Sequence, residues 1–322
     1  MFAVAALGGV RRAVTCSVRL ATATCRHLLV VDDPLRILLA MHFEDRLQRC
    51  WHRLPSMLCV GLDPDLRRLP EIVLREADPV FAFNKAIIDA TADFCCAFKP
   101  QIAYYAAIGA ERSLERTMGY LANRFPEHLR LLDAKRGDIG DTAGMYAVEA
   151  FDRYDADALT ANPYLGPEGF APFVARADRG CFLLCRTSNA GSDVLQGHGD
   201  PPLFEQIAKA ASSQWNSNRN LGLVAGATDA AALGRIRHIA PDLPLLVPGI
   251  GAQGGDLAET LLHGARPDGF GLLINSSRGV IYASSGADFA EAARVAAQAT
   301  HLAIQQALAA MTRLGSNWIS EH

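Results

Sequence analysis

The sequence predicts a (β/α)8 barrel, a fold in which eight parallel strands alternate with eight helices. From Met41 onward, short apolar runs of strand character alternate with segments whose apolar residues recur at helical spacing, and the unit repeats eight times. No GxGxxG stretch follows the first strand, which disfavours an open doubly wound sheet. No internal linker is visible. We therefore expect one barrel domain over residues 41–322.

The first elements have clear start and stop signals. LCVGLD, residues 58–63, is an apolar run typical of a buried strand. Asp-Pro at residues 78–79 marks a helix start, and helical spacing continues to Cys96. The next strand, in CAFKPQ, is expected to end at Lys99, because Pro100 cannot donate a hydrogen bond to a neighbouring strand.

The later elements follow the same alternation of apolar runs and helical patterns. The expected strands are 129–135, 157–162, 181–188, 221–227, 244–250 and 268–275. The expected helices are 111–123, 142–153, 167–177, 202–215, 229–239, 256–263 and 287–311.

Composition narrows the function classes. Half of the residues are hydrophobic and the net charge is −3, so the basic footprint of a nucleic-acid binder is missing. No apolar run reaches membrane-spanning length, and a cytoplasmic protein is expected. The eight scattered cysteines show no zinc-site spacing and are interpreted as reduced, mostly buried thiols.

The first 40 residues differ from the rest. They contain no acidic residue before Asp32 but carry four arginines ahead of it, a composition that resembles an organelle transit peptide. The alternative is that the true start is Met41 and that the upstream stretch is a misassigned or disordered extension. We favour the second interpretation and exclude residues 1–40 from the predicted fold.

Charged residues follow the first three predicted strands, where the active site of such a barrel lies. They are Asp63, Lys99, Asp133 and Lys135. Each alone is explained as readily by a surface charge or a structural ion pair, but four at successive strand ends favour a site. Asp133 and Lys135 are two residues apart, so on a regular strand they share a face. Gly137 then lets the chain turn toward Asp138.

The loops after the last two strands are suited to an anion. VPGIGAQGGD, residues 247–256, is rich in glycine and opens a helix, so its backbone N–H groups could surround a phosphate. NSSRG, residues 275–279, adds hydroxyls and Arg278. Ordinary tight turns are the alternative explanation. No histidine or carboxylate spacing suggests a metal site.

These motifs together identify a resemblance. DAKRGDIGDTA, with VGLDP, AFKPQ, RTSNAGS, VPGIGAQGG and INSSRGVIYA, resembles the orotidine 5′-phosphate decarboxylase family, in its bacterial branch with the Asp-Ala-Lys-Arg-Gly-Asp motif. The resemblance covers about residues 41–311. It implies removal of CO2 from orotidine 5′-monophosphate to give UMP, the last step of de novo pyrimidine nucleotide synthesis. It also implies that no cofactor or metal is needed, and that two subunits of a homodimer share their active sites.

The resemblance also implies residue roles. The catalytic network would comprise Lys99, Asp133 and Lys135, joined by Asp138 from the second subunit. The substrate contacts would be Asp63 at the ribose, Ser188 at the pyrimidine, Gln253 and Arg278 at the phosphate with the backbone amides of Gly251 and Gly254, and Thr142 reaching across from the second subunit. One departure is Ala190, where relatives often carry proline.

Two other functions stay open at this point. One is a metal-dependent sugar-phosphate lyase or synthase on the same scaffold, and the other is a non-catalytic barrel that binds a phosphorylated ligand. The fold alone does not distinguish them.

Overall fold

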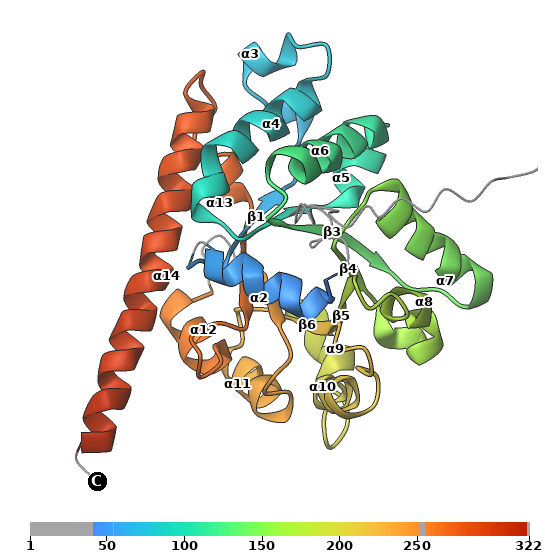
Figure 1. The fold of residues 1–322 in the computed structure, drawn as a ribbon, viewed down its shortest axis with the longest axis vertical. Helices are drawn as coiled ribbons and strands as arrows, with labels where there is room; N and C mark the ends of the chain where they lie inside the picture. Colours follow the sequence, from blue (N-terminus) through green and yellow to red (C-terminus); the bar gives the residue numbers. More distant parts are fainter. Residues whose placement is uncertain (1–40, 54, 251–254, 321–322) are drawn as a thin grey trace, which may run out of the picture.

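Eight parallel strands close into a barrel in chain order, which confirms the predicted fold class (Figure 1). The structure is a computed structural model that describes residues 41–53, 55–250 and 255–320. The strands are β1 (Leu58–Leu62), β2 (Ala97–Pro100), β3 (Leu129–Arg136), β4 (Ala158–Ala161), β5 (Gly180–Arg186), β6 (Leu221–Ala225), β7 (Leu245–Val247) and β8 (Leu272–Ser276). β8 pairs with β1 and closes the ring.

Helices surround this ring. They are α2 (Phe43–Arg53), α3 (Glu71–Leu74), α4 (Pro79–Thr91), α5 (Ile102–Ala106), α6 (Glu111–Arg124), α7 (Gly140–Ala147), α8 (Ala171–Val174), α9 (Asp193–Gln196), α10 (Leu203–Ser213), α11 (Ala230–Ile239), α12 (Leu257–Gly264), α13 (Arg278–Ile281) and α14 (Phe289–Ser320). Short turns are η1 (Leu66–Arg68), η2 (Ala92–Phe94), η3 (Val148–Arg153), η4 (Pro163–Leu165), η5 (Pro167–Gly169) and η6 (Ala190–Ser192). None of the described helices is both long and apolar enough to cross a membrane.

The strands have an apolar sequence because both of their faces are covered. Every residue of β1, β2, β4 and β6 is buried, between the barrel interior on one side and the helices on the other. The six described cysteines are free and buried, as expected. Burial raises the pKa of the Cys59 thiol to about 12, so this thiol stays protonated at neutral pH.

Several element bounds differ from the prediction. β8 begins at Leu272, four residues later than expected, because Gly269 and Gly271 adopt positive φ angles of 80° and 95°. Asp268 accepts a hydrogen bond from the backbone N–H of Phe270 and fixes this turn. The apolar pattern continued through the turn and concealed it.

Three helices and a strand also differ. The helix expected over 78–96 ends as α4 at Thr91, and the helix expected over 142–153 begins earlier, at Gly140, and becomes a π-helical turn at Val148. The segment 167–177 forms two short pieces, η5 and α8. β7 spans only residues 245–247, because Pro248 and the following glycines cannot continue its ladder.

Helix α2 lies across the end of the barrel where the strands begin (Figure 1). The indole N–H of Trp51 donates to the carbonyl of Leu272 at 2.9 Å. Arg46 pairs with the fully buried Asp157 at 3.0 Å, and Arg130 of β3 pairs with the same carboxylate at 2.8 Å. These contacts attach α2 to the start of β8 and to Asp157 just before β4, and Arg130 links the same carboxylate to β3.

Candidate active site

A cup at the opposite end of the barrel gathers the charged strand ends. Two adjoining pockets, of about 440 and 480 Å³, share Lys99, Asp133 and Pro248 as lining residues, so they form two halves of one cup. The first half extends toward the loop after β5, and the second toward the loops after β7 and β8. This is the end of the barrel at which such folds place their chemistry.

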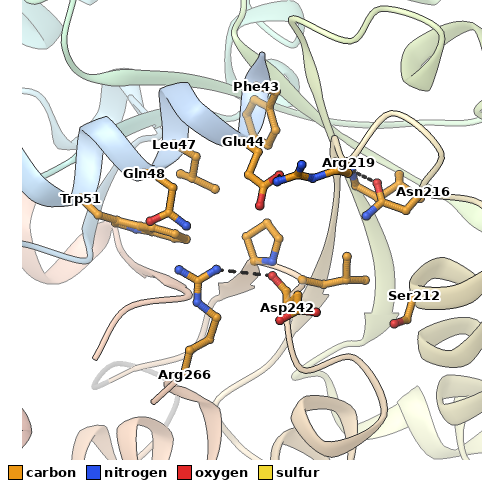
Figure 2. Close-up of a pocket in the computed structure, with 13 residues that line it drawn as sticks. Phe43, Glu44, Leu47, Gln48, Trp51, Ser212, Asn216, Arg219, Asp242 and Arg266 are labelled. Atoms are coloured by element: carbon orange, nitrogen blue, oxygen red, sulfur yellow. Dashed lines mark hydrogen bonds and ion pairs between the residues drawn. The ribbon is translucent and has the colours of Figure 1, made fainter. Parts of the chain in front are cut away.

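A separate cavity of about 520 Å³ lies beneath α2, at the other end (Figure 2). Both of its arginines are already paired, since Arg219 contacts Glu44 at 2.5 Å and Arg266 contacts Asp268 at 2.8 Å. The Arg266 guanidinium also lies 5.1 Å from the centre of the Trp51 ring. These contacts join α2 to the loops that precede β6 and β8. None of the predicted site residues lines this cavity.

Asp133 stands between two lysines at the base of the cup. One carboxylate oxygen accepts from Lys99 Nζ at 2.9 Å, and the other accepts from Lys135 Nζ at 2.6 Å. The side chains of Lys99 and Asp133 are 6% and 11% exposed, whereas that of Lys135 is 46% exposed. Lys99 and Asp133 therefore form the buried part of the network, and Lys135 is the member that a ligand in the cup can reach.

The charges hold one another ionised. Burial by itself would raise the pKa of Asp133, but the ammonium groups of Lys99 and Lys135 outweigh it and keep that pKa well below its usual range. Burial would likewise lower the pKa of Lys99, and the Asp133 and Asp63 carboxylates outweigh it, so the pKa of Lys99 lies above its ordinary value. The array is charged before any ligand enters.

Asp133 and Lys135 meet as predicted, but regular strand alternation is not the reason. Lys135 has a φ of 49°, in the left-handed region, and the β3–β4 register shifts between Leu132 and Arg136. The strand is therefore bulged at the site. Non-glycine residues in this conformation are costly and gather at functional sites.

Asp63 at the end of β1 is held in place with one oxygen unused. Its Oδ2 accepts from Ser277 Oγ at 2.6 Å, and its backbone carbonyl accepts from the Tyr282 hydroxyl at 3.0 Å. Gly61 permits this approach, because a Cβ there would lie 2.6 Å from the Ser277 Cβ. Oδ1 is buried with no hydrogen-bond partner among the described residues. Such an oxygen is suited to a hydroxyl of a ligand.

The half of the cup beside β5 is suited to a small planar ring. Its apolar wall includes Leu184, Val224 and Leu246, and Ser188 also lines it. The Gln196 amide donates to the Thr187 hydroxyl and accepts from the Thr187 N–H, both at 2.8 Å, which closes the loop after β5. Ala190 lies in the η6 turn of that loop and is exposed.

The other half of the cup contains the predicted phosphate ligand Arg278. This exposed arginine begins α13 and lines the pocket together with Ser277, Gly279 and Pro248–Ile250. The predictions for Gly251, Gln253 and Gly254 lie outside the described residues. A positive charge and hydroxyls thus line the cup at the end of β8, beside the backbone of the loop after β7.

Asp138 and Thr142 are not brought into this cup. Neither lines its two pockets, and Asp138 instead accepts from the backbone N–H of Ile139 at 2.8 Å. Exposed apolar side chains lie in the same part of the chain, from the residue before α7 to the start of η3, and in the η4 turn. They are Ile139, Met145, Val148, Tyr164 and Leu165, which are 42–76% exposed. An exposed apolar group of this size is typical of an interaction surface.

Sequence reasoning missed two residues of the cup. Thr160 of β4 donates to Asp133 at 2.9 Å, and Ser277 orients Asp63. The sequence could have indicated Ser277, because it lies in the hydroxyl-rich NSSRG stretch. A threonine inside an apolar strand, by contrast, does not stand out as a site residue. Among the described residues, no group of three or more His, Cys, Asp or Glu side chains is placed to hold a metal ion.

Comparison with known proteins decides the family. The sequence profile of the "Orotidine 5'-phosphate decarboxylase / HUMPS family" matches residues 56–294. The chain belongs to this family. A relative named orotidine 5′-phosphate decarboxylase from Ralstonia nicotianae is 50% identical over 269 residues, which cover 83% of this chain and 99% of the relative. The protein of the same name from Cellvibrio japonicus is 52% identical over 261 residues, covering 80% and 96%.

A solved structure of the family has the same fold. The structure of Leishmania donovani OMP decarboxylase is 40% identical to this chain, with a TM-score of 0.73. The match covers 83% of this chain and 99% of that one. Family membership therefore applies to the whole barrel, including the cup and its charged strand ends.

Proposed function

We propose that this protein decarboxylates orotidine 5′-monophosphate to UMP and CO2, the last step of de novo pyrimidine nucleotide synthesis, without a cofactor or metal. Its relatives at about 50% identity have the name of this activity. The observation that carries the proposal is the charged array of Lys99, Asp133 and Lys135, already ionised in a partly buried cup. We take residues 41–322 as the catalytic domain. The two interpretations of residues 1–40, a transit peptide or an extension upstream of the true start, stay predictions. The cytoplasmic location also stays a prediction.

The two halves of the cup fit the two ends of the substrate. Arg278 and the loops after β7 and β8 would hold the phosphate, with Gly251, Gln253 and Gly254 proposed to contribute there. The free oxygen of Asp63 would accept from a ribose hydroxyl. The ring would lie in the apolar half beside Ser188. This orientation brings C6 of the ring to the shared centre of the cup, over Asp133 and Lys135.

At that centre, the bond between C6 and the carboxylate carbon breaks and leaves its electron pair on C6. The Lys135 ammonium stabilises this developing carbanion and then donates a proton from Nζ to C6, while CO2 departs. The side chain is 46% exposed, so water can return a proton to the amine. Asp133 lies close to the departing carboxylate and repels it.

Repulsion alone is too weak to account for the reaction. Two like charges at ~4 Å and an effective dielectric constant of ~20 repel by about 4 kcal/mol. That corresponds to about three decades of rate, whereas enzymes commonly lower barriers by ~8–23 kcal/mol. Lys135 and the binding energy of the remote phosphate must therefore contribute the larger part.

We further propose a homodimer with shared active sites. Asp138 and Thr142 do not line the cup of their own protomer. In the sequence, Asp138 directly precedes and Thr142 falls within the segment 139–148, which carries the exposed apolar group of Ile139, Met145 and Val148. Burying that group against a second copy would carry both residues toward the cup of the partner. Asp138 would then complete the alternating network of acids and lysines.

A direct assay tests the activity. The purified chain is mixed with orotidine 5′-monophosphate and excess EDTA, and loss of the substrate's ultraviolet absorbance is followed. Loss of absorbance at full rate with EDTA supports the proposal. Loss only after Mg²⁺ is added would indicate a metal-dependent enzyme of the same fold, and no loss under either condition would leave a binding protein or another substrate.

A further inference from the structure

The bulge in β3 arises from a mismatch between two neighbouring strands. Leu132 lies opposite Leu159, and Arg136 lies opposite Ala161, so four steps along β3 match only two along β4. A regular parallel ladder keeps equal steps on both strands. The extra residues fall between Asp133 and Lys135, at the centre of the charged array. The backbone N–H groups of this stretch have lost their partners in the ladder.

The hydroxyl of Thr160 replaces those partners. Its Oγ1 accepts from the backbone N–H of Ala134 at 3.0 Å and from that of Lys135 at 2.9 Å. The same hydroxyl donates to Asp133 Oδ1 at 2.9 Å. A threonine hydroxyl has one donor and two acceptor positions, so its capacity is fully used. Thr160 is 1% exposed, and water cannot replace it without rearrangement.

We propose that Thr160 is a positioning residue for decarboxylation, acting through Asp133 and Lys135; the inference rests on the function proposed above. The hydroxyl stabilises the left-handed backbone at Lys135 and orients the carboxylate oxygen that accepts from Lys135 Nζ. One side chain on β4 thereby fixes both members of the pair on β3. Without it, the backbone N–H groups of Ala134 and Lys135 lose their partner, and the ammonium moves away from C6.

The test separates positioning from general support of the fold. Thr160→Val keeps the shape of the side chain and removes its hydroxyl. We expect kcat for orotidine 5′-monophosphate to fall about 100-fold, the usual effect of misplacing a catalytic group by ~1 Å. KM and the dissociation constant of UMP should change less than about threefold, because the ribose and phosphate contacts lie on other strands. Thr160→Ser restores the hydroxyl and should restore kcat.

Two further variants keep the test decisive. Thr91→Val removes another buried threonine hydroxyl, which donates to the carbonyl of Ile87 within α4, and should leave kcat unchanged. If Thr160→Val does not fold, Thr160→Cys takes its place, because a thiol has a similar volume and is only a weak hydrogen-bond donor and acceptor. Its kcat should lie between that of the wild type and the roughly 100-fold lower value expected when the hydroxyl is lost. Melting temperature is measured for each variant.

Three results would overturn the inference. One is a Thr160→Val enzyme with normal kcat, and another is a fall in kcat matched by an equal loss of UMP affinity. The third is a Thr160→Ser enzyme as slow as the valine variant. An inactive wild-type protein would instead refute the proposed function, so the two failures are distinguishable.

Discussion

Replacement of Lys135 by alanine should abolish turnover while the fold stays intact. The ammonium beside a carbanion at ~4 Å is worth about 4 kcal/mol at an effective dielectric constant of ~20, or about three decades of rate. Loss of a positioned general acid typically removes a further 10²–10⁴-fold. We therefore expect kcat to fall by roughly five to seven orders of magnitude.

The same substitution should affect stability little. The Lys135 side chain is 46% exposed, and an ion pair with this exposure contributes at most about 1 kcal/mol. Asp133 keeps its hydrogen bonds from Lys99 and Thr160. The free energy of unfolding, measured by urea denaturation, should change by less than about 1 kcal/mol.

Lys85→Ala is the matched control. Lys85 on α4 is 47% exposed and pairs with Asp89 at 2.7 Å, so its removal breaks a comparable ion pair away from the cup. Its kcat should equal that of the wild type. Rates are measured by stopped-time assay of UMP, with enzyme concentrations high enough to detect slow turnover. A Lys135→Ala enzyme within about tenfold of the wild type would refute the assigned role.

Three further predictions follow from the same geometry. In a dimer with shared sites, Lys135→Ala and Asp138→Ala proteins, each inactive, should regain roughly a quarter of wild-type activity after subunit exchange, since half of the dimers are hybrids with one intact site; exchange without recovery argues against sharing. Because the pKa of Asp133 is lowered and that of Lys99 is raised, the stability contributed by this pair should be full between about pH 4 and pH 10. This contribution should be lost as the pH falls through the folded pKa of Asp133, and also as the pH rises through the folded pKa of Lys99. In urea denaturation, the difference in free energy of unfolding between wild type and Asp133→Asn should therefore shrink below pH 4. Ala190→Pro should raise the melting temperature by about 1–2 °C with kcat unchanged, because Ala190 begins the η6 turn after an extended Asn189 with ψ of 146°; a lower melting temperature would show that the turn needs its N–H.

The barrel and the location of its site could be predicted because both depend on local patterns. Apolar runs bounded by charge indicate strands of a parallel sheet whose ends meet, and this brought Asp63, Lys99, Asp133 and Lys135 to one end of the barrel. The glycine-rich and hydroxyl-rich loops likewise lie beside one another around Arg278. Each of these inferences needs only the sequence near the residue concerned.

Features that depend on contacts between strands could not be predicted. The bulge at Lys135 exists because β4 supplies fewer residues than β3, a relation that neither segment reveals alone. Thr160 lies in an ordinary apolar run, and its importance comes only from the register. Helix α2 was also missed, although acidic residues in its first turn and basic residues in its last turn are local helix signals. Its contact with Asp157, more than a hundred residues away, had no such signal.

The buried ion cluster around Asp157 places much of the stability of the barrel far from its chemistry. Asp157 is fully buried and contacts Arg46 and Arg130, and removal of one partner from such a pair costs ~3–5 kcal/mol, a large part of the stability of a typical domain. Substitution of Arg46 or Arg130 should therefore lower stability without changing a residue of the cup. Loss of activity in such a variant would thus reflect a smaller fraction of folded protein, with the kcat of the folded enzyme unchanged.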